Sequence, residues 1–353
     1  MKISFVIPTL SNGGAEKVMI NIMNYLAKKN YNVELILFNN NNFHNVELSK
    51  SIKVVNLETN KMRYSFFKLI KFLRKNSREY IFSSLGYVNL SLLLIKILFS
   101  KKIKLILREA NLPSKSINNN KFSYLFHIGY FILYRKCDKL IVTSELMKKE
   151  FLNKYKVSKN KICLINNPLD VENIRKKGFN IKKLDNDCLH LVSSGRLVKQ
   201  KGFKRLIILL SNLNRDFRLY ILGQGEEYAD LKKLIDKLSL KDKVFIVGHV
   251  SNPWEWYGAA DAMLISSFWE GLPNNALECL ACGTFVLATP DSGGLVDLSK
   301  NLSNDFLKIS KFGNEYLNEI YNLKKLNKSK LNKSFLPINY DVNYIGKEIE
   351  SLF

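Results

Sequence analysis

The sequence predicts an α/β protein made of two Rossmann-like domains, each a parallel sheet covered by helices on both faces. Short strand-like runs alternate with amphipathic stretches of roughly 10–15 residues, a pattern typical of doubly wound sheets. The pattern restarts after residue 187. The chain has 353 residues with 46% apolar content, which is enough for two domains that each bury a core.

The first domain is predicted over residues 1–170. It opens with a strand at Ile3–Pro8, a helix from Gly13 to about Lys29 and a strand at Asn32–Phe38, which together form a β-α-β unit. Its further strands are expected at Lys53–Val55, Tyr80–Ser83, Ile103–Arg108, Lys139–Thr143 and Ile162–Ile165.

A polar, basic stretch over residues 171–187 is predicted to be a linker, and the second domain is predicted over residues 188–335. Its strands are expected at His190–Ser194, Phe217–Leu222, Lys243–Val247, Ala262–Ile265 and Thr284–Ala288. Between them, one helix is expected to begin at about Gly202, a second to end at Leu238 and a third to begin at Asn275.

The last part of the chain is less regular. From Asn301 it is rich in Asn and Lys and weakly patterned, whereas residues 336–353 return to an amphipathic helix that could cross back to the first domain. Ligands of doubly wound sheets bind at the carboxyl ends of the strands, so we expect a cleft between the two domains.

The positive charge is concentrated in the first half of the chain. The formal net charge is +24; residues 1–180 carry 32 Lys and Arg against 11 Asp and Glu, and residues 181–353 carry 23 against 20. No helix-turn-helix, zinc finger or other reading module accompanies it, so a nucleic-acid partner is not expected. An anionic membrane face or a polyanionic lipid-linked substrate fits the excess. A compositional bias toward Lys, Asn and Ile is the alternative.

Cysteine usage and the start of the chain favour a cytoplasmic protein. No signal peptide is visible, and the apolar stretches Val88–Ser100 and Phe122–Tyr134 are too short to span a bilayer. The five cysteines suit reduced thiols. Cys279 and Cys282 form a C-x-x-C inside an expected helix, where they fit packing better than redox or metal chemistry. The histidines lack metal-binding spacing, so no metal site is expected.

Glycine-containing turns at strand ends indicate a phosphate-bearing ligand. Gly13 and Gly14 open the first helix, where glycine lets a phosphate approach the backbone. In the turn from Ser194 to Gly202, Gly195 precedes Arg196 and Lys201. Two cations five residues apart on such a turn can hold both phosphates of a diphosphate. A lone basic loop is more often a solvated surface, and Gly223-Gln224-Gly225 lacks the third glycine of a dinucleotide fingerprint.

Two carboxylates complete the pattern. Glu270 follows an expected strand, and Glu278 lies eight residues later inside the helix expected from Asn275. Backbone N–H groups at that helix start can bind a phosphate and a sugar, while Glu278 can accept hydrogen bonds from a ribose and Glu270 from a sugar hydroxyl. Such a pair in isolation more often forms a structural ion pair and a turn cap. Beside the basic turn, a nucleotide sugar explains both carboxylates.

These motifs resemble glycosyltransferase family 4, retaining enzymes with the GT-B fold of two Rossmann-like domains facing a cleft. The resemblance covers about residues 1–300 and rests on Gly13-Gly14-Ala15-Glu16, Gly195-Arg196…Lys201-Gly202, Glu270-Gly271-Leu272-Pro273-Asn274…Glu278, Ala281-Cys282-Gly283-Thr284 and Ser292-Gly293-Gly294. The segments Arg108–Pro113 and Asn166–Asp170 are most similar to bacterial enzymes that add hexoses or N-acetylhexosamines to undecaprenyl-diphosphate glycans.

The resemblance implies a role for each matching residue. Arg196 and Lys201 would hold the donor pyrophosphate, Glu278 the ribose, and Glu270 with the backbone of Gly271, Leu272, Pro273, Asn274 and Asn275 the transferred sugar and distal phosphate. Gly13 and Gly14, with Gly195, would lie against the phosphates, and His249 and Val250 would flank the nucleobase. Ala110 stands where many relatives have histidine and Asp297 where glutamate is common, which bears on sugar selectivity.

The implied function is retaining transfer of a hexose or N-acetylhexosamine from a nucleotide sugar, expected to be a UDP-sugar, to a lipid-linked oligosaccharide in O-antigen, capsule or related glycan synthesis. No metal or other cofactor is implied, and a donor phosphate oxygen takes the acceptor proton. The protein is expected at the inner face of the cell membrane. Two alternatives stay open: another enzyme of the same fold, such as a sugar phosphorylase or nucleotide-sugar epimerase, or a non-catalytic basic protein that binds membrane or nucleic acid.

Two segments are candidates for membrane contact. Lys61–Arg78 places Phe66, Leu69, Ile70 and Leu73 on one helical face and Lys68, Lys71 and Lys75 on another. Such a helix can lie on an anionic membrane, or it can pack on the first domain with a solvated basic face. The aromatic segment Lys121–Lys136 is the second candidate.

Overall fold

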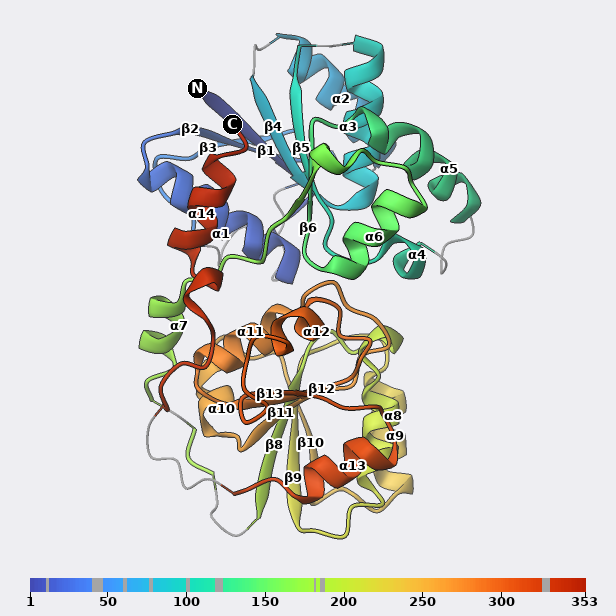
Figure 1. Cartoon of the computed structure of the whole chain (residues 1–353), viewed down its shortest axis with the longest axis vertical. Coiled ribbons are helices and arrows are strands. Elements are labelled where there is room, and N and C mark those ends of the chain that lie inside the picture. The colour runs from blue at the N-terminus through green and yellow to red at the C-terminus, as the bar shows by residue number, and fades with distance from the viewer. Residues whose placement is uncertain are drawn as a thin grey trace. The chain divides into compact units, whose positions relative to one another are not determined.

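The chain folds into two compact units (Figure 1). The computed structural model describes residues 1–10, 13–39, 47–59, 62–75, 79–99, 102–117, 123–180, 182–184, 188–325 and 331–353. The N-terminal unit comprises Met1–Leu169 together with Asn339–Phe353, and the C-terminal unit comprises Asp170–Ile338.

The N-terminal unit is built on a seven-stranded parallel sheet. All side chains of its first strand from Ile3 to Ile7 are buried, as expected of a central strand covered on both faces. In spatial order the strands are β3 (Lys53–Asn56), β2 (Asn32–Leu37), β1 (Lys2–Ile7), β4 (Tyr80–Ser84), β5 (Lys104–Arg108), β6 (Lys139–Val142) and β7 (Ile162–Leu164).

Helices cover both faces of this sheet, because successive side chains of a strand point to opposite sides. Phe5 of β1 packs in a core with α1 (Gly14–Lys28) and α14 (Val342–Glu350). Val6 packs in a second core with the helices of the other face, which are α2 (Met62–Lys75), α3 (Gly86–Phe99), α5 (Ser123–Leu133) and α6 (Glu145–Asn153). A short helix, α4 (Pro113–Ser116), follows β5.

Helix α2 uses its apolar face inside the unit. Leu69 and Leu73 are buried in the second core, and Phe66 and Ile70 pack against it. For Lys61–Arg78 the sequence allowed either packing on the first domain or contact with a membrane. The apolar face of the described part of this segment packs on the first domain. Lys75 and the ends of the segment lie outside what the structure describes at side-chain level.

The C-terminal unit has a six-stranded parallel sheet. In spatial order its strands are β10 (Val244–Gly248), β9 (Phe217–Leu222), β8 (Leu189–Ser194), β11 (Ala262–Ile265), β12 (Phe285–Ala288) and β13 (Leu307–Ile309). One core of this unit lies between the sheet and α8 (Phe203–Leu210), α9 (Tyr228–Lys237) and α13 (Asn314–Tyr321). The other helices are α7 (Val171–Lys177), α10 (Trp254–Ala259), α11 (Asn274–Ala281) and α12 (Gly294–Ser299).

Two stretches are more ordered than their sequence predicted. The expected linker over 171–187 begins with α7, which Asp170 caps by accepting a hydrogen bond from the Asn173 N–H at 3.0 Å. The weakly patterned tail after Asn301 supplies β13 and α13. Tyr316 of α13 is fully buried and donates to the carbonyl oxygen of Leu287 at 2.9 Å, a tertiary contact that local periodicity does not reveal.

The C-terminal helix belongs to the N-terminal unit. Ile345 and Ile349 of α14 are buried in the core that α1 lines. Gly346 faces Tyr25 of α1, and a Cβ at this glycine would lie 2.4 Å from the tyrosine ring. The glycine therefore allows the two helices to approach closely.

We expect Gly346→Val to lower the free energy of unfolding by about 1–3 kcal/mol, because the added side chain overpacks the α1–α14 contact. Denaturant unfolding followed by circular dichroism measures the loss. Lys347→Val is the control, since it adds the same residue at the next, exposed position of α14. Equal losses in both variants would contradict the close approach at Gly346.

Candidate functional site

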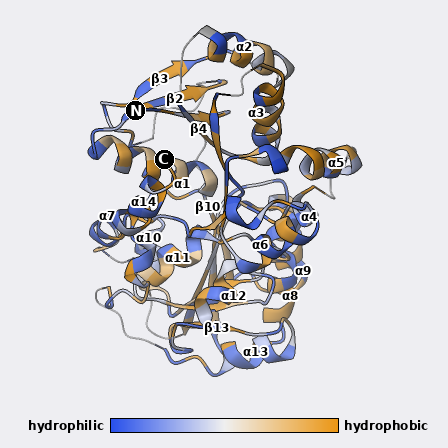
Figure 2. Cartoon of the chain, turned by 45° about the horizontal axis from the view of Figure 1, so that its top comes forward, coloured by the Kyte–Doolittle hydropathy of each residue, from blue (hydrophilic) through white to orange (hydrophobic). Residues whose placement is uncertain are grey.

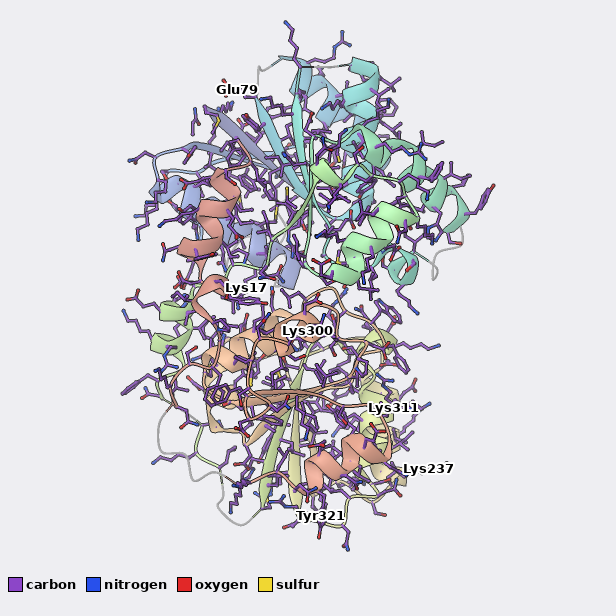
Figure 3. The ribbon with its side chains drawn as sticks, viewed as in Figure 1. Lys17, Glu79, Lys237, Lys300, Lys311 and Tyr321 are labelled. Carbon is purple, nitrogen blue, oxygen red and sulfur yellow. The ribbon has the colours of Figure 1, made fainter. Side chains whose placement is uncertain are left out.

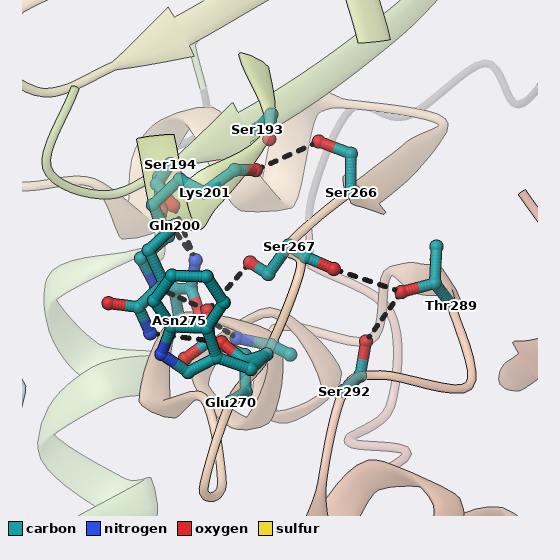
Figure 4. Close-up of polar contacts among 12 residues, drawn as sticks. Ser193, Ser194, Gln200, Lys201, Ser266, Ser267, Glu270, Asn275, Thr289 and Ser292 are labelled. Carbon is teal, nitrogen blue, oxygen red and sulfur yellow. Dashed lines mark hydrogen bonds and ion pairs between the residues drawn. The ribbon is translucent and has the colours of Figure 1, made fainter. Parts of the chain in front are cut away.

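The candidate site lies where two neighbouring strands of the C-terminal sheet end. β8 pairs with both β9 and β11, so the strand order reverses at β8. Ligands of doubly wound sheets bind at the carboxyl ends beside such a switch point. β8 ends at Ser194 and β11 ends at Ile265. The turn after β8 and the loop after β11 therefore meet (Figure 4).

The turn after β8 requires glycine at both ends. Gly195 has a φ of +144° and Gly202 a φ of +67°, conformations that other residues rarely adopt. A Cβ on Gly202 would lie 2.2 Å from the carbonyl oxygen of Ser266. This glycine thus lets the turn touch the loop that follows β11.

The turn at Gly223-Gln224-Gly225 supports the first turn. The Gly195 N–H donates to the carbonyl oxygen of Leu222 at 2.9 Å, and a Cβ on Gly223 would lie 1.9 Å from the carbonyl oxygen of Gly195. A Cβ on Gly225 would lie 2.4 Å from the carbonyl oxygen of Leu197. The two glycines that resembled an incomplete phosphate pattern therefore serve backbone packing.

Lys201 and Glu270 form an ion pair between the turn and the loop. Lys201 Nζ lies 2.6 Å from Glu270 Oε1, and the Ser267 hydroxyl donates to the same oxygen at 2.7 Å. The side chains are only 17% and 7% exposed, so water screens the pair weakly. An ammonium group has three donors, and Lys201 can therefore hold Glu270 and an anionic ligand together.

Arg205 on α8 fixes the backbone that carries Glu270. Its Nε donates to the carbonyl oxygen of Ser266 at 2.7 Å and its Nη2 to that of Ser267 at 2.6 Å. The guanidinium lies 4.0 Å from the ring centre of Phe268 and 4.3 Å from that of Phe312. Burial lowers the pKa of Arg205 from its ordinary value.

A second glycine contact holds the loop from the other side. The Glu270 N–H donates to the carbonyl oxygen of Asp291 at 3.0 Å, and the Gly294 N–H donates to that of Gly271 at 2.6 Å. Gly293 has a φ of +57°, and a Cβ there would lie 2.1 Å from the Gly271 oxygen. The Ser292-Gly293-Gly294 motif thus packs directly against the segment that leads into α11.

Glu278 is buried in α11 and is oriented by a tryptophan. Trp254 Nε1 donates to Glu278 Oε2 at 2.9 Å. At the start of the same helix, Asn275 Nδ2 donates to the carbonyl oxygen of Ser194 at 2.6 Å, and the Ser194 hydroxyl lies 2.7 Å from the Tyr257 hydroxyl. Burial and then the nearby Glu278 raise the pKa of Tyr257 well above its ordinary value, so its hydroxyl stays protonated.

The structure thus brings together Gly195, Lys201, Glu270, Asn275 and Glu278. Gly271, Leu272 and Pro273 are buried in the segment before Asn274, the first residue of α11. The N–H groups of a first helical turn have no carbonyl partner within the helix and can bind an anion.

The other predicted residues take no part in the contacts described above. Arg196 is exposed on the turn after β8, and His249 and Val250 follow the end of β10. Gly13 and Gly14 begin α1 in the N-terminal unit. Their roles stay predictions.

Several residues of the site were not anticipated. Ser194 and Ser267 stand at the carboxyl ends of β8 and β11, and polar residues at that place were a usable signal. Arg205, Trp254 and Tyr257 gave no such signal, because only the tertiary fold brings them to the site.

No metal-ligand cluster occurs in the described part of the chain, as no three His, Cys, Asp or Glu side chains there are arranged to hold an ion. The five cysteines are free thiols. None of the described helices is long and apolar enough to cross a bilayer.

The N-terminal unit has a buried polar cluster at the carboxyl end of β5. Asn89 Nδ2 donates to Glu109 Oε1 at 2.7 Å, the Tyr134 hydroxyl donates to the same oxygen, and the Tyr130 hydroxyl lies 3.3 Å from Oε2. Burial raises the pKa of Glu109 to about 7, against the lowering effect of these hydrogen bonds and of Arg108. Burial also lowers the pKa of Arg108 to about 10.

Two family models match the chain, one after the other. The model described as "Glycosyltransferase Family 4" matches residues 12–173, and the model described as "Glycosyl transferases group 1" matches residues 174–333.

Similar proteins cover most of the chain. An uncharacterized glycosyltransferase of Haemophilus influenzae is 30% identical over 313 residues, which are 87% of this chain and 85% of that protein. An N-acetylgalactosamine-N,N'-diacetylbacillosaminyl-diphospho-undecaprenol 4-alpha-N-acetylgalactosaminyltransferase of Campylobacter jejuni is 29% identical over 306 residues, 84% of this chain and 83% of that enzyme. The crystal structure of Anabaena Alr3699/HepE with UDP and glucose superposes with a TM-score of 0.78 at 18% identity, over 99% and 98% of the two chains.

The fold and these matches define the class as glycosyltransferases of the GT-B fold, and the predicted fold class is confirmed. The chain belongs to glycosyltransferase family 4, as its motifs predicted, and is therefore a transferase.

We expect Glu109→Gln to change how stability depends on pH. The carboxyl has a pKa of about 7 in the folded protein against an ordinary value of 4.5, so the folded state binds the extra proton between these values. Wild-type stability should therefore fall, relative to the variant, as pH rises from about 4.5 to 7, by on the order of 3 kcal/mol in total. Chemical unfolding of both proteins at a series of pH values tests this; parallel curves would contradict it.

Proposed function

We propose that the chain transfers a hexose or N-acetylhexosamine, with retention, from a nucleotide sugar to a lipid-linked oligosaccharide. The observation that carries the proposal is the Lys201–Glu270 pair, whose Glu270 lies in the loop that leads into α11, with Glu278 inside that helix. This set offers a cation, helix N–H groups and two carboxylates to one ligand. A sugar joined to a nucleoside diphosphate presents the matching groups, which are anionic phosphates between two sets of hydroxyls.

We propose one orientation for the donor in this site. Lys201 and Arg196 would contact the diphosphate, the first turn of α11 the distal phosphate, Glu270 the transferred sugar and Glu278 the ribose. A uridine nucleotide is the first donor to test, because the similar Anabaena structure contains UDP and glucose. His249 and Val250, after β10, would flank the base.

The chemistry needs charge stabilisation more than a protein acid or base. As the glycosidic bond to the nucleotide breaks, the sugar becomes oxocarbenium-like and the diphosphate gains negative charge. Lys201, Arg196 and the helix N-terminus would stabilise that charge where it develops. In a same-face transfer a donor phosphate oxygen takes the acceptor proton. We therefore propose that no metal is required.

The acceptor is inferred from relatives. The similar Campylobacter enzyme is named for an undecaprenyl-diphosphate-linked substrate. A glycan on such a lipid remains at the membrane, and the positive charge of the first half of the chain suits the anionic inner surface. We infer that the protein works there in surface polysaccharide or glycan synthesis.

Lys201→Ala and Glu278→Ala should each lower turnover about 100-fold or more, because each removes a charged contact from a weakly screened site. Turnover of a panel of nucleotide sugars, followed as released nucleotide diphosphate, measures the loss and identifies the donor. Lys199→Ala, an exposed lysine of the same turn, is the control and should retain activity. Near-normal rates in a folded Lys201 or Glu278 variant would refute the assignment.

Trp254→Phe should weaken donor binding by roughly 5–20-fold, because it keeps an aromatic ring but removes the N–H that orients Glu278. The donor KM is the readout. In a Glu278→Ala background the same change should have little further effect, since the acceptor through which the tryptophan acts is then absent. Independent, additive losses would show that Trp254 does not act through Glu278.

A further inference from the structure

Helices α3 and α5 of the N-terminal unit expose several large apolar side chains. In Figure 2 the ribbon of α5 is largely orange, the colour of hydrophobic residues. On α5, Tyr124 is 74% exposed and Leu125 62%, and Ile128 and Ile132 continue the same face at helical spacing. On α3, Leu94 and Leu98 are also exposed. We call these six side chains the α3–α5 surface.

The two helices that carry these six side chains touch each other. A Cβ on Gly129 of α5 would lie 3.3 Å from Leu90 of α3, so the helices are in contact at this glycine. Leu90, Leu94 and Leu98 follow one another at four-residue spacing along one face of α3. Single exposed apolar residues are ordinary, whereas a contiguous patch marks an interaction site.

The opposite face of α5 already has its partners. Tyr130 of α5 and Tyr134, in the turn that follows the helix, are buried and contact Glu109, so the helix cannot turn its outer face inward without breaking that cluster. Between Ser123 and Leu133 the helix has no charged side chain. The outer face is therefore available to a partner with an apolar interior.

The segment of chain that contains the surface is strongly cationic. Residues 61–139 contain 17 Lys and Arg against three Asp and Glu. Of the three acidic residues, Glu109 is buried and Asp138 is paired with Lys96. The third, Glu79, lies just before β4 and away from α5 (Figure 3). The Arg135 guanidinium lies 3.9 Å from the ring centre of Phe131 on α5, a cation at the edge of apolar surface.

These charges distinguish between possible partners. A second copy of the chain would bring two cationic rims together, which costs energy, whereas an anionic bilayer offers hydrocarbon to the apolar residues and negative headgroups to the rim. We propose that the α3–α5 surface is the part of this glycosyltransferase that docks on an anionic lipid bilayer. This surface specifies which part of the protein makes the membrane contact proposed above. Only the biological role of the docking rests on that proposed function.

Vesicle co-sedimentation of the full chain tests the proposal. Wild-type protein should bind vesicles of phosphatidylcholine with phosphatidylglycerol and bind pure phosphatidylcholine less, with weaker binding at high salt because the charges are screened. Ile128→Asn with Ile132→Asn should reduce binding about tenfold or more, since both apolar side chains leave the membrane contact. Ile208→Asn is the control, because Ile208 on α8 is 44% exposed, between the 37% of Ile128 and the 55% of Ile132.

A charge variant covers the case in which the double variant fails to fold. Arg135→Glu with Lys136→Glu leaves every apolar residue in place and should reduce binding to anionic vesicles selectively. Absent binding of wild type, or wild-type binding by folded variants of both kinds, would overturn the proposal. A third outcome would also overturn it: the wild-type protein is a dimer, the Ile128/Ile132 variant is a monomer, and the variant still binds vesicles. The partner of the surface would then be a second copy of the chain.

The donor site gives an independent readout. UDP-glucose binding should be the same in wild type and in all these variants, because the α3–α5 surface contains none of the donor-site residues. Lost vesicle binding with intact donor binding would support the surface. Intact vesicle binding with no binding of any nucleotide sugar would refute the proposed function and leave the docking surface standing.

Discussion

The ion pair between Lys201 and Glu270 is the contact on which the architecture of the candidate site depends. It joins two loops that are far apart in sequence but follow adjacent parallel strands, β8 and β11. The parallel sheet supplies the proximity, because both strands end at the same edge. The pair then fixes the distance between a cation and a carboxylate at that edge. A ligand bound there meets both charges at once.

The ion pair can form only because the backbones of the neighbouring loops approach each other closely. Gly202 lets the turn after β8 reach the Ser266 carbonyl oxygen, and Gly293 lets the segment beyond β12 reach Gly271. Arg205 then holds two carbonyl oxygens of the β11 loop. The glycines are therefore as much part of the site as the charged residues, since a side chain at either would separate the loops.

Sequence reasoning reached the parts of the fold and site that are encoded locally. Strand alternation predicted both sheets. The glycine turns with their charges drew attention to Lys201, Glu270 and Glu278, whose contacts the structure shows and whose roles stay predictions. It missed β13 and α13, because Tyr316 is buried by tertiary packing rather than by a local pattern. It also missed Trp254, whose bond to Glu278 joins residues from two different helices. Such partners become visible only when the chain is folded.

The sequence also could not predict which face of helix α5 is exposed. Its sequence is apolar apart from Ser123 and His127, and a helix this apolar is ordinarily buried all round. Hydrophobic periodicity therefore could not say which face is covered. In the folded unit the polar tips of Tyr130 and Tyr134 select the inner face, because the buried Glu109 carboxyl and Asn89 require hydrogen-bond partners there. The requirement of one buried carboxyl thus orients the helix and leaves Leu125, Ile128 and their neighbours on the outside.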